Sequence, residues 1–168
     1  MPERKAFRFQ AIGVIRSPYS DPAQTPIQPV FAPGVAGRVE LFPEYSDALK
    51  DLDGFSYVHL IYVLHLACTA KLRVKPFLHD VEHGIFATRS PTRPNPIGMS
   101  IVRLVRIEDT VLHVEDMDIV DGTPLLDIKP YAPRFDVRDG ARSGWMDEVA
   151  DATARQRGRR AGRSPNQF

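Results

Sequence analysis

The proline-rich segment Phe86–Ser100 (FATRSPTRPNPIGMS) restricts the fold of this chain more than any other stretch. Pro91, Pro94 and Pro96 fall within six residues. Each proline fixes φ, removes a backbone donor and disfavours helical backbone at the residue before it. The segment therefore predicts a stiff, extended loop that is neither a helix nor a regular strand.

Polar side chains stand on this loop, and apolar runs flank it on both sides. The polar residues are Arg89, Ser90, Thr92, Arg93 and Asn95, and the runs at 83–88 (HGIFAT) and 97–107 (IGMSIVRLVRI) are predicted to be strands. Rigid loops between strands are common places for binding sites. The loop is therefore a candidate binding site, and the alternative is a structural connection with solvated arginines.

The rest of the chain predicts short strands separated by turns. Apolar alternation and β-branched or aromatic residues indicate strands at Phe9–Ser17, Gly37–Phe42, Tyr57–Cys68, Ile97–Glu108, Thr110–Met117 and Leu125–Lys129. A tight turn at Asp109 predicts an antiparallel hairpin. Because no long helix separates the strands, we expect an all-β fold, a small closed or nearly closed β-barrel with short peripheral helices and a C-terminal tail.

The segments between the predicted strands are expected to be loops and one short helix. Five prolines in Pro18–Pro33 indicate a long loop, and Lys71–Glu82 is also loop-like. A short helix is expected at residues 47–52 with Ser46 as its N-cap.

The C-terminal part is expected to stand apart from the barrel. Residues 1–140 would form the barrel domain, and residues 141–168 a short helix and a basic tail. The helix is expected over Ser143–Gln156, with an apolar stripe of Met146, Val149, Ala150 and Thr153. Arg155–Arg163 carries five arginines and no acid, which predicts a disordered tail that either aids solubility or contacts RNA phosphates.

Composition bounds the class of protein. A chain of 168 residues with 43% hydrophobic residues can bury one sizeable core. The net charge of +1 gives no overall field that attracts nucleic acid, although a local basic patch is compatible with it. The single cysteine, Cys68, excludes a disulfide within the chain and fits a reducing compartment. With no signal-like start and no run of roughly 20 apolar residues, we expect a cytoplasmic protein with no membrane partner.

Several chemistries are disfavoured by the motifs. The chain has no dinucleotide-binding or P-loop fingerprint. His79–His83 (HDVEH) matches an inverted zinc-protease motif, but a proline before it and a glycine after it leave hardly two helical turns, so we expect surface loop residues and no metal. Cys68 in an apolar strand would have a raised thiol pKa and be inert. Neither Ser90 nor Ser100 lies in a G-x-S-x-G turn, so covalent catalysis is not expected.

Three acids surround a tight-turn sequence further along the chain. Asp118, Asp121 and Asp127 lie around the turn Gly122-Thr123-Pro124. Such a turn exposes backbone donors, and an aspartate can accept a hydrogen bond from a ribose hydroxyl. A metal or acid–base role is a second interpretation, and plain turn chemistry is a third.

Three motifs together resemble the TrmO/TsaA-like family of S-adenosylmethionine-dependent tRNA methyltransferases. They are GVIRSPY (13–19), the proline loop, and DIVDGTPLLDIKPY (118–131), in the family's order between about Phe9 and Asp136. The resemblance implies a β-barrel fold, S-adenosylmethionine as cofactor, tRNA as partner, and a homodimer with the cofactor near the subunit interface. It implies N6-methylation of threonylcarbamoyladenosine at position 37 of tRNA.

The resemblance also implies the site residues. Those expected to line the S-adenosylmethionine site are Pro26, Ile27, Gln28, His65, Leu66, Arg89, Met99, Asp118, Asp121, Gly122, Thr123 and Pro124. Arg93 and Asn95 would face the methyl acceptor, and no catalytic residue is assigned. Methyl transfer asks the protein mainly to position the two reactants, a task that suits a rigid loop.

Two departures from the family keep other functions open. Ile27 stands where the family often has arginine, and bacterial members commonly carry a further C-terminal domain. A non-catalytic protein that binds S-adenosylmethionine or a nucleotide is therefore one alternative, and a small-molecule methyltransferase is another.

Overall fold

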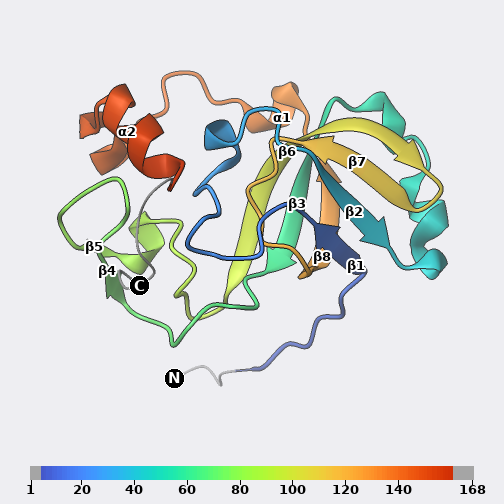
Figure 1. Cartoon of the computed structure of the whole chain (residues 1–168), viewed down its shortest axis with the longest axis horizontal. Helices are drawn as coiled ribbons and strands as arrows, with labels where there is room; N and C mark the ends of the chain where they lie inside the picture. Colours follow the sequence, from blue (N-terminus) through green and yellow to red (C-terminus); the bar gives the residue numbers. More distant parts are fainter. Residues whose placement is uncertain (1–4, 161–168) are drawn as a thin grey trace.

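A closed barrel of antiparallel strands forms the body of the protein in a computed structural model that describes residues 5–160 (Figure 1). Its strands are β1 (Gly13–Arg16), β2 (Gly37–Leu41), β3 (Tyr57–Val63), β6 (Ile97–Glu108), β7 (Val111–Glu115) and β8 (Thr123–Pro130). They pair in the order β1-β2-β7-β6-β3-β8, and β8 pairs with β1 to close the barrel. The predicted all-β barrel is confirmed.

The core fills the inside of this barrel. Successive side chains of a strand point to opposite faces, so every second residue faces inward. In β3, Val58, Leu60 and Tyr62 are buried while their neighbours are not. Fully buried side chains on the remaining strands include Ile15, Val39, Val102, Leu112, Val114 and Leu125.

The predicted hairpin at Asp109 is confirmed. β6 and β7 pair with Glu108 opposite Val111, which leaves a two-residue turn. Asp109 adopts a φ of 52°, the left-handed conformation that two-residue hairpin turns require. The strand predicted at Tyr57–Cys68 is shorter in the structure, because β3 ends at Val63 and a turn follows. Cys68 is therefore exposed and does not lie in a strand.

The helix expected after β2 is wrong in type and start. The 3-10 helix η2 (Pro43–Leu49) begins earlier, with Phe42 as its N-cap and Pro43 at its first position, and η3 (Leu52–Gly54) follows. Ser46 therefore lies inside a helix rather than capping one. Proline favours the first helical position because its missing N–H needs no partner there, and this signal overrode the weaker serine cap.

The strand expected at residues 83–88 is also mostly wrong. Only β5 (His83–Gly84) is extended, and it pairs with β4 (Arg73–Val74) inside a segment predicted to be a loop. The 3-10 turn η4 (Ile85–Ala87) follows and buries Ile85. Thr88 Oγ1 donates to the Ile85 carbonyl at 2.9 Å, which closes this turn in place of strand pairing.

The C-terminal segment folds as three short pieces. They are α1 (Pro133–Asp136), η5 (Gly144–Glu148) and α2 (Asp151–Gly158). The single helix predicted over residues 143–156 is wrong, because Val149 and Ala150 are extended between η5 and α2. Part of the tail predicted to be disordered, residues 155–158, lies in α2, and residues 161–163 lie outside the described part of the chain.

The segment with α2 packs on the loop between β1 and β2. That loop contains η1 (Pro29–Phe31). The Ile27 N–H donates to the Gly158 carbonyl at 2.9 Å, and a side chain at Gly158 would collide with the ring of Phe31. Figure 1 shows α2 beside this loop, at the end of the molecule away from the β6–β7 hairpin. Between residues 5 and 160, no helix has the length and apolar character needed to cross a membrane.

Candidate functional site

A cavity of about 540 Å³ lies where the long loops meet one end of the barrel. This volume lies in the range of sites for small molecules. Ten of the fourteen residues predicted to bind the cofactor or the methyl acceptor line this cavity: Pro26, Ile27, Gln28, His65, Leu66, Arg89, Arg93, Met99, Asp118 and Thr123. The other four, Asn95, Asp121, Gly122 and Pro124, are not in its wall. The barrel thus brings together segments that are far apart in the sequence.

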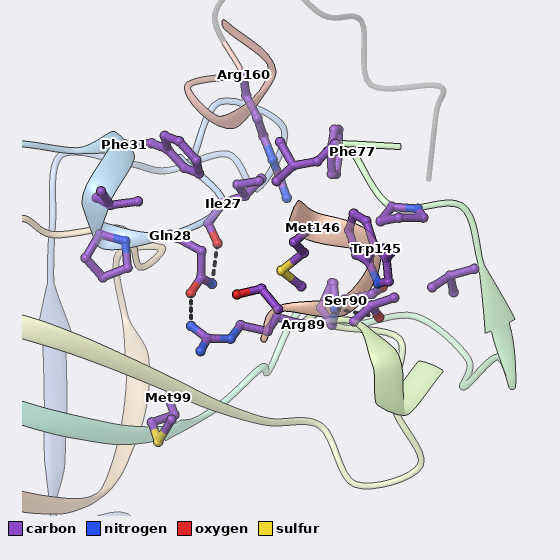
Figure 2. A pocket seen from close by; sticks show the side chains of 18 of the residues that line it. Ile27, Gln28, Phe31, Phe77, Arg89, Ser90, Met99, Trp145, Met146 and Arg160 are labelled. Carbon is purple, nitrogen blue, oxygen red and sulfur yellow. Dashed lines mark hydrogen bonds between the residues drawn. The ribbon is translucent and has the colours of Figure 1, made fainter. Parts of the chain in front are cut away.

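Arg89 and Gln28 join the two loops that face each other across the site. The Arg89 guanidinium donates to Gln28 Oε1, and Gln28 Nε2 donates to the Ile27 carbonyl at 2.6 Å (Figure 2). Arg89 remains exposed. The amide therefore holds the guanidinium at the cavity while leaving it donors for an anionic or polar ligand.

Hydrogen bonds fix the proline loop that carries Arg89. Arg93 donates to the Thr88 carbonyl at 2.8 Å and to the Ile85 carbonyl at 3.3 Å. The Lys71 N–H donates to the Thr92 carbonyl at 3.0 Å. Arg93, predicted to face the acceptor, lines the cavity but uses its guanidinium on this loop, whereas Asn95 is exposed outside the cavity.

Asp118 is a buried carboxylate in the cavity wall. It follows β7 and is 7% exposed, and its Oδ1 has no hydrogen-bond partner among the described residues. Burial raises the pKa of Asp118 to about 7, although Ser100 and the charge of Arg89 oppose the shift. A carboxylate near half-ionisation at neutral pH can both accept and hold a proton.

The neighbours of Asp118 form a buried polar pair that the sequence did not reveal. Tyr62 Oη and Ser100 Oγ lie 3.0 Å apart, and the pKa of Tyr62 is raised by burial and by the charge of Asp118. Tyr62 pairs with Gly98 across β3 and β6, and any side chain at Gly98 would collide with the tyrosine ring. The clue in the sequence was Ser100 at an inward phase of β6, where apolar residues are expected.

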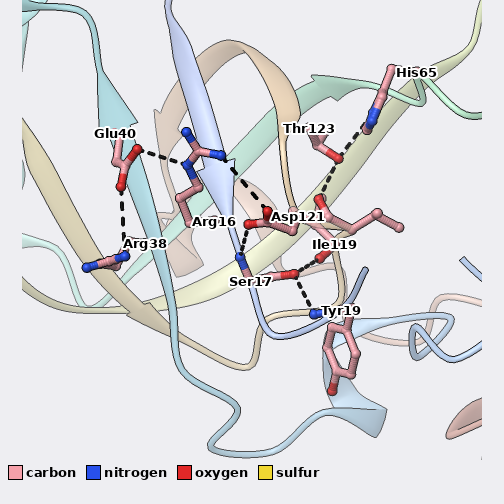
Figure 3. A network of polar contacts seen from close by, with 10 residues as sticks. Arg16, Ser17, Tyr19, Arg38, Glu40, His65, Ile119, Asp121 and Thr123 are labelled. Carbon is pink, nitrogen blue, oxygen red and sulfur yellow. Dashed lines mark hydrogen bonds and ion pairs between the residues drawn. The ribbon is translucent and has the colours of Figure 1, made fainter. Parts of the chain in front are cut away.

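His65 and Thr123 meet at another part of the wall. Thr123 Oγ1 donates to the Val120 carbonyl at 2.7 Å and lies 3.4 Å from His65 Nδ1 (Figure 3). Since its proton is used on Val120, the hydroxyl can only accept a hydrogen bond from the imidazole. His65 is otherwise exposed, so its ring is available to a ligand in the cavity.

Asp121 serves the turn in this structure. Its Oδ1 accepts the Ser17 N–H at 3.0 Å, and its Oδ2 lies 3.9 Å from Arg16 (Figure 3). The Asp121 N–H also donates to the Tyr19 carbonyl. Gly122 has a φ of 76°, which favours glycine. The motifs GVIRSPY and DIVDGTP are thus bonded to each other, and this contact positions the Asp118–Thr123 segment.

A second, larger cavity of about 1220 Å³ adjoins the first. The two share wall residues, including Gln28, Arg89 and Met99. Its outer part is lined by Trp145, a residue that no sequence pattern singled out. His79 and His83, predicted to be surface loop residues, hydrogen-bond to each other at 2.9 Å and stack on this tryptophan.

Comparison with known proteins identifies the family. The model of the tRNA-methyltransferase O N-terminal domain matches residues 14–137, most of the chain. The chain belongs to this family. The solved structure of TrmO from Pseudomonas aeruginosa aligns with a TM-score of 0.73 at 38% identity, over 88% of this chain and 64% of that chain. The predicted family is therefore confirmed.

Two curated relatives carry different names. A protein of Pyrococcus abyssi, named a probable S-adenosyl-L-methionine-binding protein, is 51% identical over 83% of this chain and 76% of its own length. The tRNA (adenine(37)-N6)-methyltransferase of Escherichia coli is 40% identical over 76% of this chain. The chain spans 59% of the length of that enzyme and 64% of the TrmO structure.

Proposed function

We propose that this chain is an S-adenosylmethionine-dependent methyltransferase that methylates N6 of adenine 37 in tRNA, with threonylcarbamoyladenosine as the acceptor. One observation carries the proposal: ten of the fourteen predicted site residues line the same cavity, the smaller of the two. Family membership and the name of the Escherichia coli relative support the reaction. The proposed activity rests on the site and does not follow from the barrel alone.

The residues of the cavity fit S-adenosylmethionine. Arg89, held by Gln28, supplies cationic donors for its carboxylate or ribose, and the exposed Met99 and Leu66 supply apolar contact. The cofactor supplies a methyl group that is already activated on a sulfonium sulfur. The chain must then hold the acceptor nitrogen in line with the methyl group and the leaving sulfur, and remove the proton of that nitrogen.

Asp118 is the residue proposed to take this proton. The N6 nitrogen of the acceptor bears a hydrogen beside a carbonyl group, so its lone pair is a weak nucleophile until that hydrogen leaves. Asp118 lies in the cavity wall, and its Oδ1 accepts no hydrogen bond from any residue between 5 and 160. A general base works best when its pKa lies near the operating pH, and that of Asp118 is about 7.

The active protein is further proposed to be a cytoplasmic homodimer. Support for the dimer comes from the outward side of β6, where Ile97, Met99, Ile101 and Val105 are between 36% and 48% exposed. An apolar stripe of this length on one strand is typical of an interface. Because Met99 also lines the cavity, a second copy on β6 would help to enclose the cofactor. The cytoplasmic location follows from the proposed tRNA substrate.

The division of the chain is part of the proposal. Residues 1–140 would make up the barrel domain, and residues 141–168 a short helix and a basic tail. Residues 1–4 and 161–168 lie outside the described part of the chain. The end of the family match at residue 137 supports this boundary.

A second candidate is a protein that binds S-adenosylmethionine without transferring methyl groups. The name of the Pyrococcus abyssi relative favours it, since that name states binding only. Ile27, which offers no charged group to the cavity it lines, also favours it.

Transfer of radiolabelled methyl from S-adenosylmethionine to tRNA separates the two candidates. The tRNA should come from cells that make threonylcarbamoyladenosine, with tRNA lacking that group as the control. We expect label in the first tRNA only. Arg89→Ala should weaken cofactor binding by about 10-fold or more, since hydrogen bonds from charged groups contribute about 1.5–3 kcal/mol. Cofactor binding without any label in tRNA would favour the second candidate, and intact binding by Arg89→Ala would refute the site.

A further inference from the structure

The larger cavity is an open groove that the cofactor site does not explain. It begins at Arg89 and Met99, which it shares with the smaller cavity, and extends over β4 to the segment after the barrel (Figure 2). Its far wall contains Arg142 and Trp145, beyond residue 137, where the family match ends. A volume of about 1220 Å³ exceeds what one cofactor needs.

The groove is lined with positive charge. Its basic lining residues are Lys71, Arg73, Lys75, Arg89, Arg142 and Arg160, against two acids, Glu82 and Asp116. Arg73 lies 3.8 Å from Glu82. Within residues 5–160, no ion pair joins Lys71, Lys75 or Arg142 to an acid. The charges of these three residues are therefore available to a polyanion, although the whole chain is almost neutral.

Three of the basic residues lie in or beside β4. Arg73 belongs to the strand, and Lys71 and Lys75 lie just before and just after it. All three are exposed and line the groove. A row of this kind matches a chain of phosphates better than a single anion does.

Trp145 adds a fixed aromatic surface. Its Nε1–H donates to the Ala87 carbonyl at 2.8 Å, and its ring stacks on His79 and His83 at centroid distances of 5.7 and 4.7 Å. The two imidazole centroids are 5.1 Å apart. If the two imidazoles lay on opposite faces of the indole, their centroids would be at least about 7 Å apart, which is twice the contact distance between stacked rings. Both histidines therefore lie on one face of the indole. The tryptophan is also partly exposed and lines the groove, where a ligand can meet it.

We infer that this groove binds single-stranded RNA next to the methyl acceptor, with one base stacked on Trp145 and phosphates on Lys71 and Lys75. This inference rests on the proposed function, whose substrate it places. Aromatic faces flanked by basic side chains are the usual means of holding unpaired nucleotides. The shared wall at Arg89 lets one nucleotide enter the cofactor cavity while its neighbour lies in the groove.

Trp145 is the only tryptophan of the chain, so its fluorescence reports directly on the groove. The probe is an RNA hairpin with the stem and loop of an anticodon arm, and a fully paired RNA duplex is its control. We expect the hairpin to quench the fluorescence to saturation and the duplex to quench it much less. Binding of the hairpin without quenching would overturn the inference.

Variants test the two kinds of contact separately, with a fluorescent label on the hairpin. Trp145→Ala should weaken binding about 10-fold, because one stacked base contributes about 1–3 kcal/mol and 1.4 kcal/mol is tenfold. Trp145→Phe keeps an aromatic face and should bind more tightly than the alanine variant. The double variant Lys71→Ala, Lys75→Ala should lower the slope of log affinity against log salt by about 1.4, at about 0.7 per phosphate contact.

The matched control is Arg38→Ala, on β2. Arg38 is 57% exposed and outside both cavities, so its loss should leave hairpin binding unchanged. Equal losses in Arg38→Ala and in the lysine variant would overturn the inference. The two proposals can fail separately. Quenching by the hairpin without methyl transfer to tRNA would support RNA binding in the groove and refute the proposed function. Methyl transfer without quenching would support the function and refute RNA binding in the groove.

Discussion

Asp118→Asn should make the folded protein more stable at high pH. The same substitution removes the proposed proton acceptor. The substitution keeps the shape of the side chain and removes its charge. Asp118 is 7% exposed, and burial raises its pKa from an ordinary 3.8 to about 7. An unpaired charge in such a place opposes folding whenever the carboxyl is ionised.

The size of this effect follows from the two pKa values. Below pH 3.8 the carboxyl is protonated in both the folded and unfolded states and costs nothing. Between about pH 4 and pH 7 only the unfolded chain ionises, so the free energy of unfolding falls with rising pH and levels off above 7. Three pKa units at 1.36 kcal/mol each give a loss of about 4 kcal/mol, of which about 2–3 kcal/mol falls between pH 5 and pH 8.

Urea unfolding of both proteins at pH 5 and at pH 8 measures this loss. The buried amide of the variant adds a penalty of about 1–3 kcal/mol, but that penalty is the same at both pH values and cancels in the comparison. The advantage of Asp118→Asn over the wild type should therefore grow by about 2–3 kcal/mol from pH 5 to pH 8. Asp127→Asn is the control, because Asp127 is 44% exposed and pairs with Lys129.

Activity should move in the opposite direction. Without a proton acceptor, kcat should fall by about 10²–10⁴-fold while S-adenosylmethionine still binds. In the wild type, kcat should decrease about tenfold per pH unit below 7, and this limb should be absent from the variant. An advantage in stability that is equal at pH 5 and pH 8 would refute the buried charge. An unchanged kcat would refute the role of Asp118 in catalysis.

Two further predictions concern the barrel itself. Gly98→Ala should lower the free energy of unfolding in urea by about 1–3 kcal/mol, because its Cβ would overlap the Tyr62 ring, whereas Gly84→Ala, at an open position, should not. Ile101→Glu should shift the sedimentation of the protein from dimer to monomer, since it puts a charge on the apolar stripe of β6, and Val137→Glu is its exposed control. A monomeric wild type would refute the proposed dimer.

The barrel was predictable because its strands are rich in β-branched and aromatic residues and no long helix separates them. Ile97–Glu108 matched β6 to the residue, since Pro96 ends the proline loop just before it and the turn at Asp109 follows it. The helices were less predictable. Pro43 and the extended residues Val149 and Ala150 divide these segments into 3-10 turns and short helices whose ends depend on tertiary contacts.

The cavity could be located from the sequence only through the family's motifs. No periodicity brings Pro26 and Arg89 to one cavity, because they meet there only when the loop after β1 folds across the end of the barrel. The pairing of Tyr62 with Ser100 depends on the register of β3 against β6, which the separate strands do not encode in an obvious way. Trp145 lies in a segment with no strong pattern, and its role appears only where it meets His79 and His83.

The C-terminal segment contacts both loops of the proposed cofactor site. Trp145 bonds to the Ala87 carbonyl, two residues before Arg89, and the Gly158 carbonyl accepts the N–H of Ile27, one residue before Gln28. Arg89 and Gln28 are themselves bonded across the cavity. A segment that contacts both neighbours of this pair restricts how far the two loops can separate. Trp145, which would stack a base of the RNA in the groove, therefore also holds the loop that carries the guanidinium proposed to bind S-adenosylmethionine. This shared residue would couple the binding of substrate to the binding of cofactor.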